Sequence, residues 1–180
     1  MSPVRRLNWG CGGEPEPGWI NSDRKEAPGV DVSCDIRDGL PFADASIDYI
    51  VSIHALPEVP YPDLVPVLTE LHRVLAPGGV LRLALPDLGR AVDAWRAGDR
   101  AYFLIGDDEM ETLGGKMITQ LIWFGYSRTP FVPEFAEELL RRAGFSEVHH
   151  VEFSRTASAH PEIVTLDDRP AESFFVEAVR

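Results

Sequence analysis

The sequence predicts one α/β domain with a mostly parallel sheet. Apolar strand-like runs alternate with amphipathic helical runs over most of the 180 residues, and this alternation is typical of parallel sheets. Near the end of the chain, a polar loop without a helix joins the last two strands, which indicates an antiparallel pair at one edge. No repeat, low-complexity tract or linker interrupts residues 1–180, so we expect a single domain.

Four strands are expected before the first helix. The fourth, Ile47–Ile53, is almost wholly apolar, as a parallel strand buried on both faces is. Pro15 and Pro17 prevent a helix between the first two strands. The four strands are expected at Val4–Trp9, Trp19–Asp23, Val30–Asp35 and Ile47–Ile53.

The first clear helix is expected at Pro62–Leu75, where leucines and valines recur at helical spacing before a Pro-Gly-Gly turn. Further helices are indicated around Leu88–Trp95, over Ala101–Phe124 with a break at Gly114-Gly115, and around Phe135–Ala143 with an end at Gly144. The remaining strands are expected at Val80–Leu85, Glu147–Phe153 and Ser173–Val179, with a loop over Arg155–Pro170.

Charge and hydropathy exclude several kinds of partner. The net charge is −12, and arginines and lysines form no cluster, so a nucleic-acid partner is not expected. No apolar run approaches the roughly 18 residues of a membrane span, and no signal-peptide core follows Arg5-Arg6. We therefore expect a cytoplasmic protein with a small-molecule substrate and no membrane partner.

The chemistry is expected where the strands end, because open α/β sheets bind ligands at the carboxyl ends of their strands. A glycine turn, Gly10–Gly13, follows the first strand, Asp23 ends the second, Asp35-Ile36 ends the third, and His54 follows the fourth. An acid at the second strand end can bind ribose hydroxyls, and an acid beside an apolar residue can take the amino group and the face of an adenine. Taken singly, each has a structural alternative: a common turn, a solvated acid or a packed histidine.

Taken together, these motifs resemble the class I S-adenosylmethionine-dependent methyltransferases, specifically the small methyltransferase-domain group called type 11. The resemblance is specific over the first half of the chain and weaker afterwards. The segments that carry it are Leu7–Gly13, Trp19–Asp23, Cys34–Phe42, Phe42–Ser52, Leu71–Gly79 and Arg142–Phe145. The resemblance implies a Rossmann-like seven-stranded sheet in the order 3-2-1-4-5-7-6, with strand seven antiparallel and helices on both faces. It also implies S-adenosyl-L-methionine as the cofactor.

The resemblance assigns a part of the cofactor to each strand end. Gly10–Gly12 would pass under the methionine part, Asp23 would hold the ribose, and Asp35 with Ile36 would hold the adenine. Ser52–His54 would lie beside the sulfonium. The cofactor residues implied in this way are Asn8, Gly10, Cys11, Gly12, Asp23, Asp35, Ile36, Ile53 and His54.

The sequence departs from the family pattern in ways that bear on this site. Asn8 stands where the first motif usually has an acid, so it can accept a hydrogen bond but brings no charge. The connection from Gly10 to Trp19 is too short for a crossover helix, so the first helices are expected to be shortened or absent. We expect the exposed site to be covered either by a second subunit, giving a homodimer, or by the segment Ala101–Phe131.

Methyl transfer needs a general base only when the acceptor must lose a proton, and His54 is the candidate catalytic residue. The aromatic residues Trp123, Phe124, Tyr126 and Phe131, with Arg128, are either an acceptor pocket or core packing. No metal site is expected. The alternatives are a module that binds the cofactor or another nucleoside without catalysis and a fold that serves only protein association. A nicotinamide-dependent oxidoreductase is disfavoured because no GxGxxG helix follows the first strand.

Overall fold

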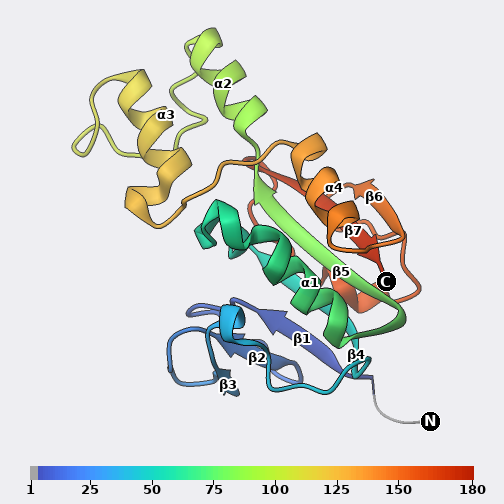
Figure 1. Cartoon of the computed structure of the whole chain (residues 1–180). Helices are drawn as coiled ribbons and strands as arrows, with labels where there is room; N and C mark the ends of the chain where they lie inside the picture. Colours follow the sequence, from blue (N-terminus) through green and yellow to red (C-terminus); the bar gives the residue numbers. More distant parts are fainter. Residues whose placement is uncertain (1–3) are drawn as a thin grey trace.

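The computed structural model describes residues 4–180 and contains a seven-stranded sheet in the order β3-β2-β1-β4-β5-β7-β6 (Figure 1). Strand β7 is antiparallel to β5 and β6, and the other neighbours are parallel. The predicted strand order is therefore confirmed. The strands are β1 Arg6–Trp9, β2 Ile20–Asp23, β3 Val32–Ser33, β4 Ile47–Ile53, β5 Leu75–Pro86, β6 Glu147–Val151 and β7 Ser173–Val179.

Strand β5 is longer than expected, with twelve residues where six were expected, whereas β3 has only two residues where six were expected. The cause is local: the carboxylate of Asp31 accepts a hydrogen bond from the backbone N–H of Asn21 at 2.8 Å. A side chain there takes the place of a strand-to-strand hydrogen bond, so regular pairing begins only at Val32.

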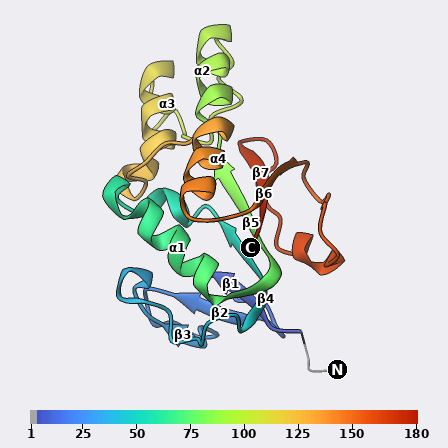
Figure 2. The ribbon, with the colours of Figure 1, turned by 45° about the vertical axis from the view of Figure 1, so that its right-hand side comes forward.

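One face of the sheet is covered by α1 and α4 (Figures 1 and 2). Leu68 and Leu71 of α1 and Leu140 of α4 pack there into the main hydrophobic core with Leu81 of β5. Pro133 begins α4, and Gly144, with a φ of 104°, follows its end. The α-helices are α1 Leu64–Val74, α2 Leu88–Ala97, α3 Leu113–Ile122 and α4 Pro133–Arg142.

The opposite face is covered mainly by the connection between β6 and β7, which contains only a short 3₁₀ helix, Pro161–Val164. Its Ile163 is fully buried in a second apolar cluster with Trp19 and Tyr49. The expected helical layer is thus reduced to one turn on this face. As expected, β1, β2 and β3 follow one another without an intervening α-helix.

Arg82, on the central strand β5, holds this connection to the sheet. Its guanidinium is fully buried and pairs with Asp167 at 2.5 Å and with Glu177 at 2.7 Å. It also donates to the backbone oxygens of Glu152 and Arg155. Four acceptors around one buried cation fix both ends of the segment that leads into β7.

The segment after β5 differs from the sequence prediction. Helices were expected over Ala101–Phe124 with a break at Gly114-Gly115, but residues 101–112 are not helical and both glycines lie in the first turn of α3. The hydroxyl of Thr112 accepts a hydrogen bond from the N–H of Gly115. Thr112 therefore starts the helix at the place where the glycines were expected to end one. Trp95, in the helix expected around Leu88–Trp95, is 45% exposed.

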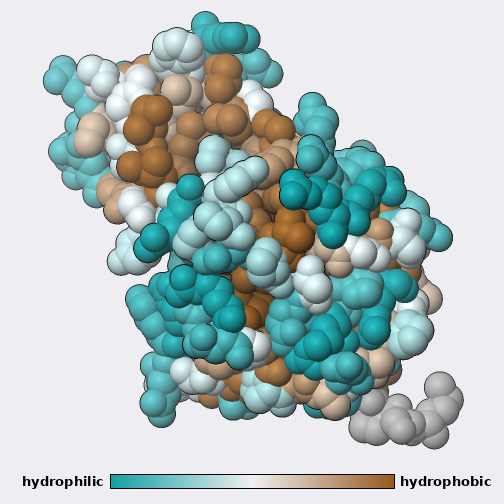
Figure 3. Space-filling model, in the orientation of Figure 1, coloured by the Kyte–Doolittle hydropathy of each residue, from teal (hydrophilic) through white to brown (hydrophobic). Residues whose placement is uncertain are grey.

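Helices α2 and α3 project beyond the carboxyl end of β5 and pack on each other (Figures 1 and 2). Apolar side chains gather on the surface over this projection (Figure 3). Exposed large apolar residues in this part of the chain include Trp95, Leu104, Ile118 and Ile122. Within residues 4–180, no helix combines the length and apolarity needed to cross a membrane.

Candidate functional site

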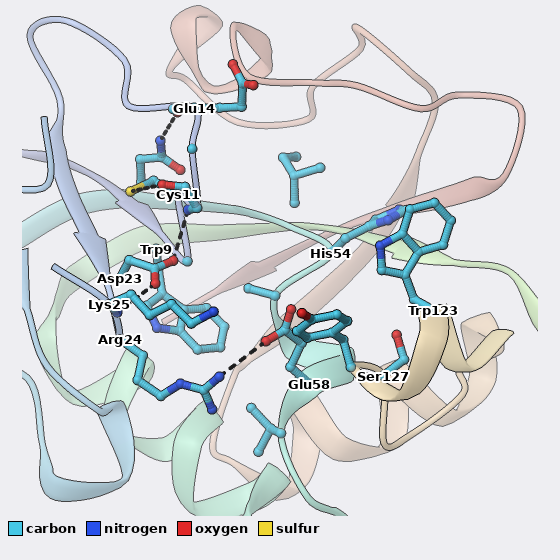
Figure 4. A pocket seen from close by; sticks show the side chains of 18 of the residues that line it. Trp9, Cys11, Glu14, Asp23, Arg24, Lys25, His54, Glu58, Trp123 and Ser127 are labelled. Carbon is cyan, nitrogen blue, oxygen red and sulfur yellow. Dashed lines mark hydrogen bonds and ion pairs between the residues drawn. The ribbon is translucent and has the colours of Figure 1, made fainter. Parts of the chain in front are cut away.

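A cavity of about 780 Å³ opens at the carboxyl ends of β1, β2 and β4. Its volume is within the roughly 300–1,000 Å³ range of ligand pockets. Figure 4 shows Cys11, Asp23 and Lys25 on one side of it, with His54 and Trp123 across from them. All nine residues that the sequence predicted for cofactor binding line this cavity: Asn8, Gly10, Cys11, Gly12, Asp23, Asp35, Ile36, Ile53 and His54.

The glycine turn after β1 forms the floor of one side. Gly10 has a φ of 71°, and a Cβ at this position would come within 2.2 Å of the Cβ of Ala55. The N–H groups of Gly10 and Cys11 both donate to the carbonyl of Ser22. Gly12 has a φ of 56°, and a Cβ there would meet no atom within 4 Å. Glycine is therefore required at position 10 by packing, whereas at position 12 it leaves the backbone bare to the cavity.

Asp23 ends β2 beside this turn. One carboxylate oxygen accepts from the N–H of Gly12 at 2.9 Å, and the other accepts from the N–H of Lys25 at 2.9 Å. Both donors are backbone groups, so they fix the direction of the carboxylate without neutralising it. Each oxygen keeps a further lone pair for a ligand hydroxyl.

Asn8 is buried below the turn, and its side chain ties β1 to β2. Its Nδ2 donates to the carbonyl of Glu14 at 3.3 Å and to Oδ1 of Asn21 at 3.1 Å. Both amide hydrogens are thus used within the fold, and Oδ1 is the polar atom that remains for a ligand. A carboxylate could not donate these two hydrogen bonds, which explains an amide at this position.

Asp35 caps the 3₁₀ helix Ile36–Asp38, and its carboxylate pairs with Arg37 at 2.6 Å. Hydrogen bonds from Arg37 lower the pKa of Asp35 to about 2. Ile36 is largely buried in the main core and still lines the cavity. Asp35 and Ile36 therefore both line the cavity, and Asp35 is ionised near neutral pH and already paired with an arginine. Their adenine-binding role stays a prediction.

His54 has a φ of 58° and both of its ring nitrogens are engaged. Nε2 lies 2.7 Å from Oγ of Ser173, and Nδ1 lies 3.5 Å from Nη1 of Arg169. Because arginine can only donate, Nδ1 is the acceptor and Nε2 carries the proton. Burial, with Arg169 as the second cause, lowers the pKa of His54 to about 4. These contacts favour a neutral, positioning His54 over the general base expected from the sequence.

The segment after α3 closes the cavity on the side of His54. Trp123, Tyr126 and Arg128 line it, whereas Phe124 is exposed and Phe131 is buried in the core. Trp123 and Phe124 both have a positive φ, at 41° and 55°, and such strain in non-glycine residues is concentrated at functional sites. Of the two covers expected from the sequence, the segment Ala101–Phe131 therefore supplies a wall; a homodimer stays a prediction.

Three polar residues of this wall were not predicted from the sequence. Gln120 comes from α3, and Arg169 and Glu172 come from the connection before β7. Arg169 also lies over the Trp123 ring, with its Cζ 5.9 Å from the ring centroid. The three come together only through tertiary packing and belong to no local motif. No sequence pattern links them: Gln120 lies within α3, and only Glu172 directly precedes a strand.

The two cysteines, Cys11 and Cys34, are unpaired thiols that line the cavity. Burial raises the pKa of both thiols. The carboxylates of Asp23 and Asp35 raise it further at Cys11 and Cys34, respectively. Both side chains therefore stay protonated near neutral pH and act here as small apolar wall residues.

The sequence is similar to known methyltransferases. Residues 9–83 match the model described as a methyltransferase domain. A demethylmenaquinone methyltransferase of Listeria monocytogenes serotype 4a is 35% identical over 123 residues, which are 67% of this chain and 50% of that protein. A probable methyltransferase of Aspergillus luteorubrus is 32% identical over 131 residues, covering 67% of this chain and 40% of that protein. The chain thus spans about half the length, or less, of these curated relatives.

Solved structures share the fold at lower identity. A SAM-dependent methyltransferase from Archaeoglobus fulgidus superposes with a TM-score of 0.63 at 15% identity, over 98% of this chain and 86% of that one. One from Thermotoga maritima superposes with a TM-score of 0.60 at 20% identity, over 99% of this chain and 83% of that one. The likeness extends over nearly the whole chain, including the part after residue 83 that the family model does not match.

Proposed function

The chain belongs to the class I S-adenosylmethionine-dependent methyltransferases, and on that premise we propose that it transfers a methyl group from S-adenosylmethionine to a small-molecule acceptor. One observation carries the proposal. A single cavity joins the bare glycine turn after β1, the Asp23 carboxylate after β2 and the Asp35-Ile36 pair after β3. This is the order in which methionine, ribose and adenine would be held.

The residues present fit this cofactor. The turn at Gly10–Gly12 lines the cavity, and no atom lies within 4 Å of where a Cβ on Gly12 would be, so its backbone is open to a ligand. The Asp23 carboxylate has lone pairs to accept from two ribose hydroxyls, and Oδ1 of Asn8 can accept from the ammonium group. When bound, the cofactor supplies an activated methyl group on a sulfonium leaving group. The chain itself binds the cofactor and the acceptor, orients them and excludes water from them.

The charges of the walls suit a cationic cofactor. His54 is neutral near pH 7 because its pKa is about 4, so it adds no positive charge to the cavity. We propose that it positions Arg169 and Ser173, with which it shares hydrogen bonds, and that it does not take a proton from the acceptor. Trp123 and Tyr126 narrow the cavity on this side and restrict the approach of water.

A small molecule is the acceptor class best supported. The net charge of −12 disfavours a nucleic-acid acceptor, and the named substrate of the Listeria relatives is itself a small molecule. Beside the residues proposed for the cofactor, the cavity has a further wall that includes Trp123 and Glu172. We place the acceptor there.

The test is turnover with methyl-labelled S-adenosylmethionine and a panel of small phenols, quinols and amines. Acceptor-dependent formation of S-adenosylhomocysteine, with label in the acceptor, is the expected result. Binding of the cofactor without label transfer to any acceptor would favour the alternative, a non-catalytic binding module. Absence of cofactor binding would favour the reading in which the fold serves only association.

A further inference from the structure

Among the described residues that line the cavity, Glu172 is the one buried acid, and it lies on the side proposed for the acceptor. It is 8% exposed, lines the cavity and immediately precedes β7. Its carbonyl accepts a hydrogen bond from the N–H of Asp87 at 2.8 Å. The backbone is therefore fixed against the end of β5, and the side chain is directed by the fold.

One oxygen of this carboxylate has a fixed partner. Nε2 of Gln120 donates to Oε2 of Glu172 at 3.3 Å, while Oε1 of Gln120 accepts from the N–H of Leu104 at 2.7 Å. Because a backbone N–H can only donate, the orientation of the Gln120 amide is determined. Gln120 thus presents its amino group to Glu172 and holds the carboxylate in place.

The other oxygen, Oε1, is buried and has no hydrogen-bond partner within residues 4–180. The nearest cation is Nη1 of Arg169 at 3.7 Å, beyond hydrogen-bond distance. Arg169 also faces His54 at 3.5 Å and Asp168 at 3.6 Å. A buried acceptor without a hydrogen bond is unfavourable, and burial raises the pKa of Glu172. Because Glu172 lines the cavity, its Oε1 can accept a hydrogen bond from a bound ligand.

We propose that Glu172 recognises the methyl acceptor by accepting a hydrogen bond from its O–H or N–H group. This rests on the proposed function, since it concerns the second substrate of the same cavity. The proposed acceptor site has two carboxylates, Glu172 and Asp168, for one guanidinium, that of Arg169. His54 beside them is neutral near pH 7 and adds no positive charge. The site therefore selects an amine or a hydroxyl and disfavours a carboxylate or a phosphate.

The test uses the protein saturated with S-adenosylhomocysteine and three probes with one ring and different head groups: benzylamine, benzyl alcohol and benzoate. Calorimetry on the wild type should rank benzylamine first and benzoate last. Glu172→Gln should weaken benzylamine about tenfold or more, because the ammonium group loses its charged acceptor, and should leave benzoate equal or tighter. Glu162→Gln, on the exposed 3₁₀ helix of the same segment, is the matched control and should keep the ranking.

Retained benzoate binding separates a lost interaction from a misfolded variant, and thermal unfolding of Glu172→Gln should give an equal or higher Tm. Equal affinities of the three probes for the wild type, including no binding of any, would overturn the inference. So would an unchanged benzylamine affinity in Glu172→Gln. In either case S-adenosylhomocysteine binding by the wild type would leave the proposed function standing. Failure of the wild type to bind S-adenosylhomocysteine would contradict the proposed function itself, and this inference with it.

Discussion

The carboxylate of Asp23 accepts a hydrogen bond from the N–H of Gly12 at 2.9 Å, and this contact joins the end of β2 to the turn after β1. It connects two of the four strand ends that the cofactor would touch. In this chain no helix separates β1 from β2. Side-chain and backbone hydrogen bonds therefore hold the turn after β1 against the end of β2. The site is therefore defined by a small number of contacts that can be removed one at a time.

Gly10→Ala tests the close approach of the turn to Ala55. Gly10 and Gly78 have φ values of 71° and 76°, but a Cβ at Gly10 would lie 2.2 Å from Ala55 whereas one at Gly78 would meet nothing within 4 Å. Gly78→Ala should cost about 1–2 kcal/mol from the left-handed backbone alone. Gly10→Ala should cost about 1–3 kcal/mol more from the clash. Urea unfolding measures both, and equal costs would show that Ala55 moves aside.

Arg82→Met tests the buried ion pairs that hold the connection before β7. It leaves the buried carboxylates of Asp167 and Glu177 without their cation, and breaking such a pair from one side costs about 3–5 kcal/mol. The matched control is Arg141→Met, which removes an exposed helical pair with Glu137 and should cost about 0.5 kcal/mol or less. The free energy of unfolding in urea decides it, and similar losses in the two variants would contradict the account.

His54 provides a pH prediction. Its pKa in the folded chain is about 4, below its ordinary value of 6.5, so the unfolded chain binds the proton more readily. The contribution of His54 to the free energy of unfolding should therefore be fully present above pH 6.5 and should decline as the pH falls toward 4. His54→Gln should lessen this decline. NMR titration of the ring reports the pKa directly, and a midpoint near 6.5 would restore His54 as the candidate general base.

The strand order and the strand-end residues could be predicted because they depend on local patterns. Apolar runs place β4 and β7 at the predicted bounds, and acids such as Asp23 follow strands at positions that topology brings to one edge. The pairing of Asp35 with Arg37 was not anticipated, because the sequence does not specify which rotamers the two side chains adopt. The break expected at Gly114-Gly115 was wrong because the cap at Thr112 outweighs the low helix propensity of two glycines in a first turn.

The cavity wall formed by Gln120, Arg169 and Glu172 could not be predicted, because these residues meet only after folding. Gln120, Arg169 and Glu172 lie on two segments far apart in the chain. Glu172 is placed by its backbone bond to Asp87 and by Gln120, and its segment is held by the buried Arg82. None of these contacts has a spacing that a sequence pattern reveals.

The central claim is that Asp23 and the glycine turn hold the cofactor. Calorimetric titration with S-adenosylhomocysteine tests it most directly, on the wild type, on Asp23→Ala and on the exposed control Glu162→Gln. The account predicts micromolar binding by the wild type and the control, and a loss of at least about tenfold in Asp23→Ala, because two ribose hydroxyls lose a charged acceptor. Equal binding by all three proteins, or none by the wild type, would contradict the site as placed here.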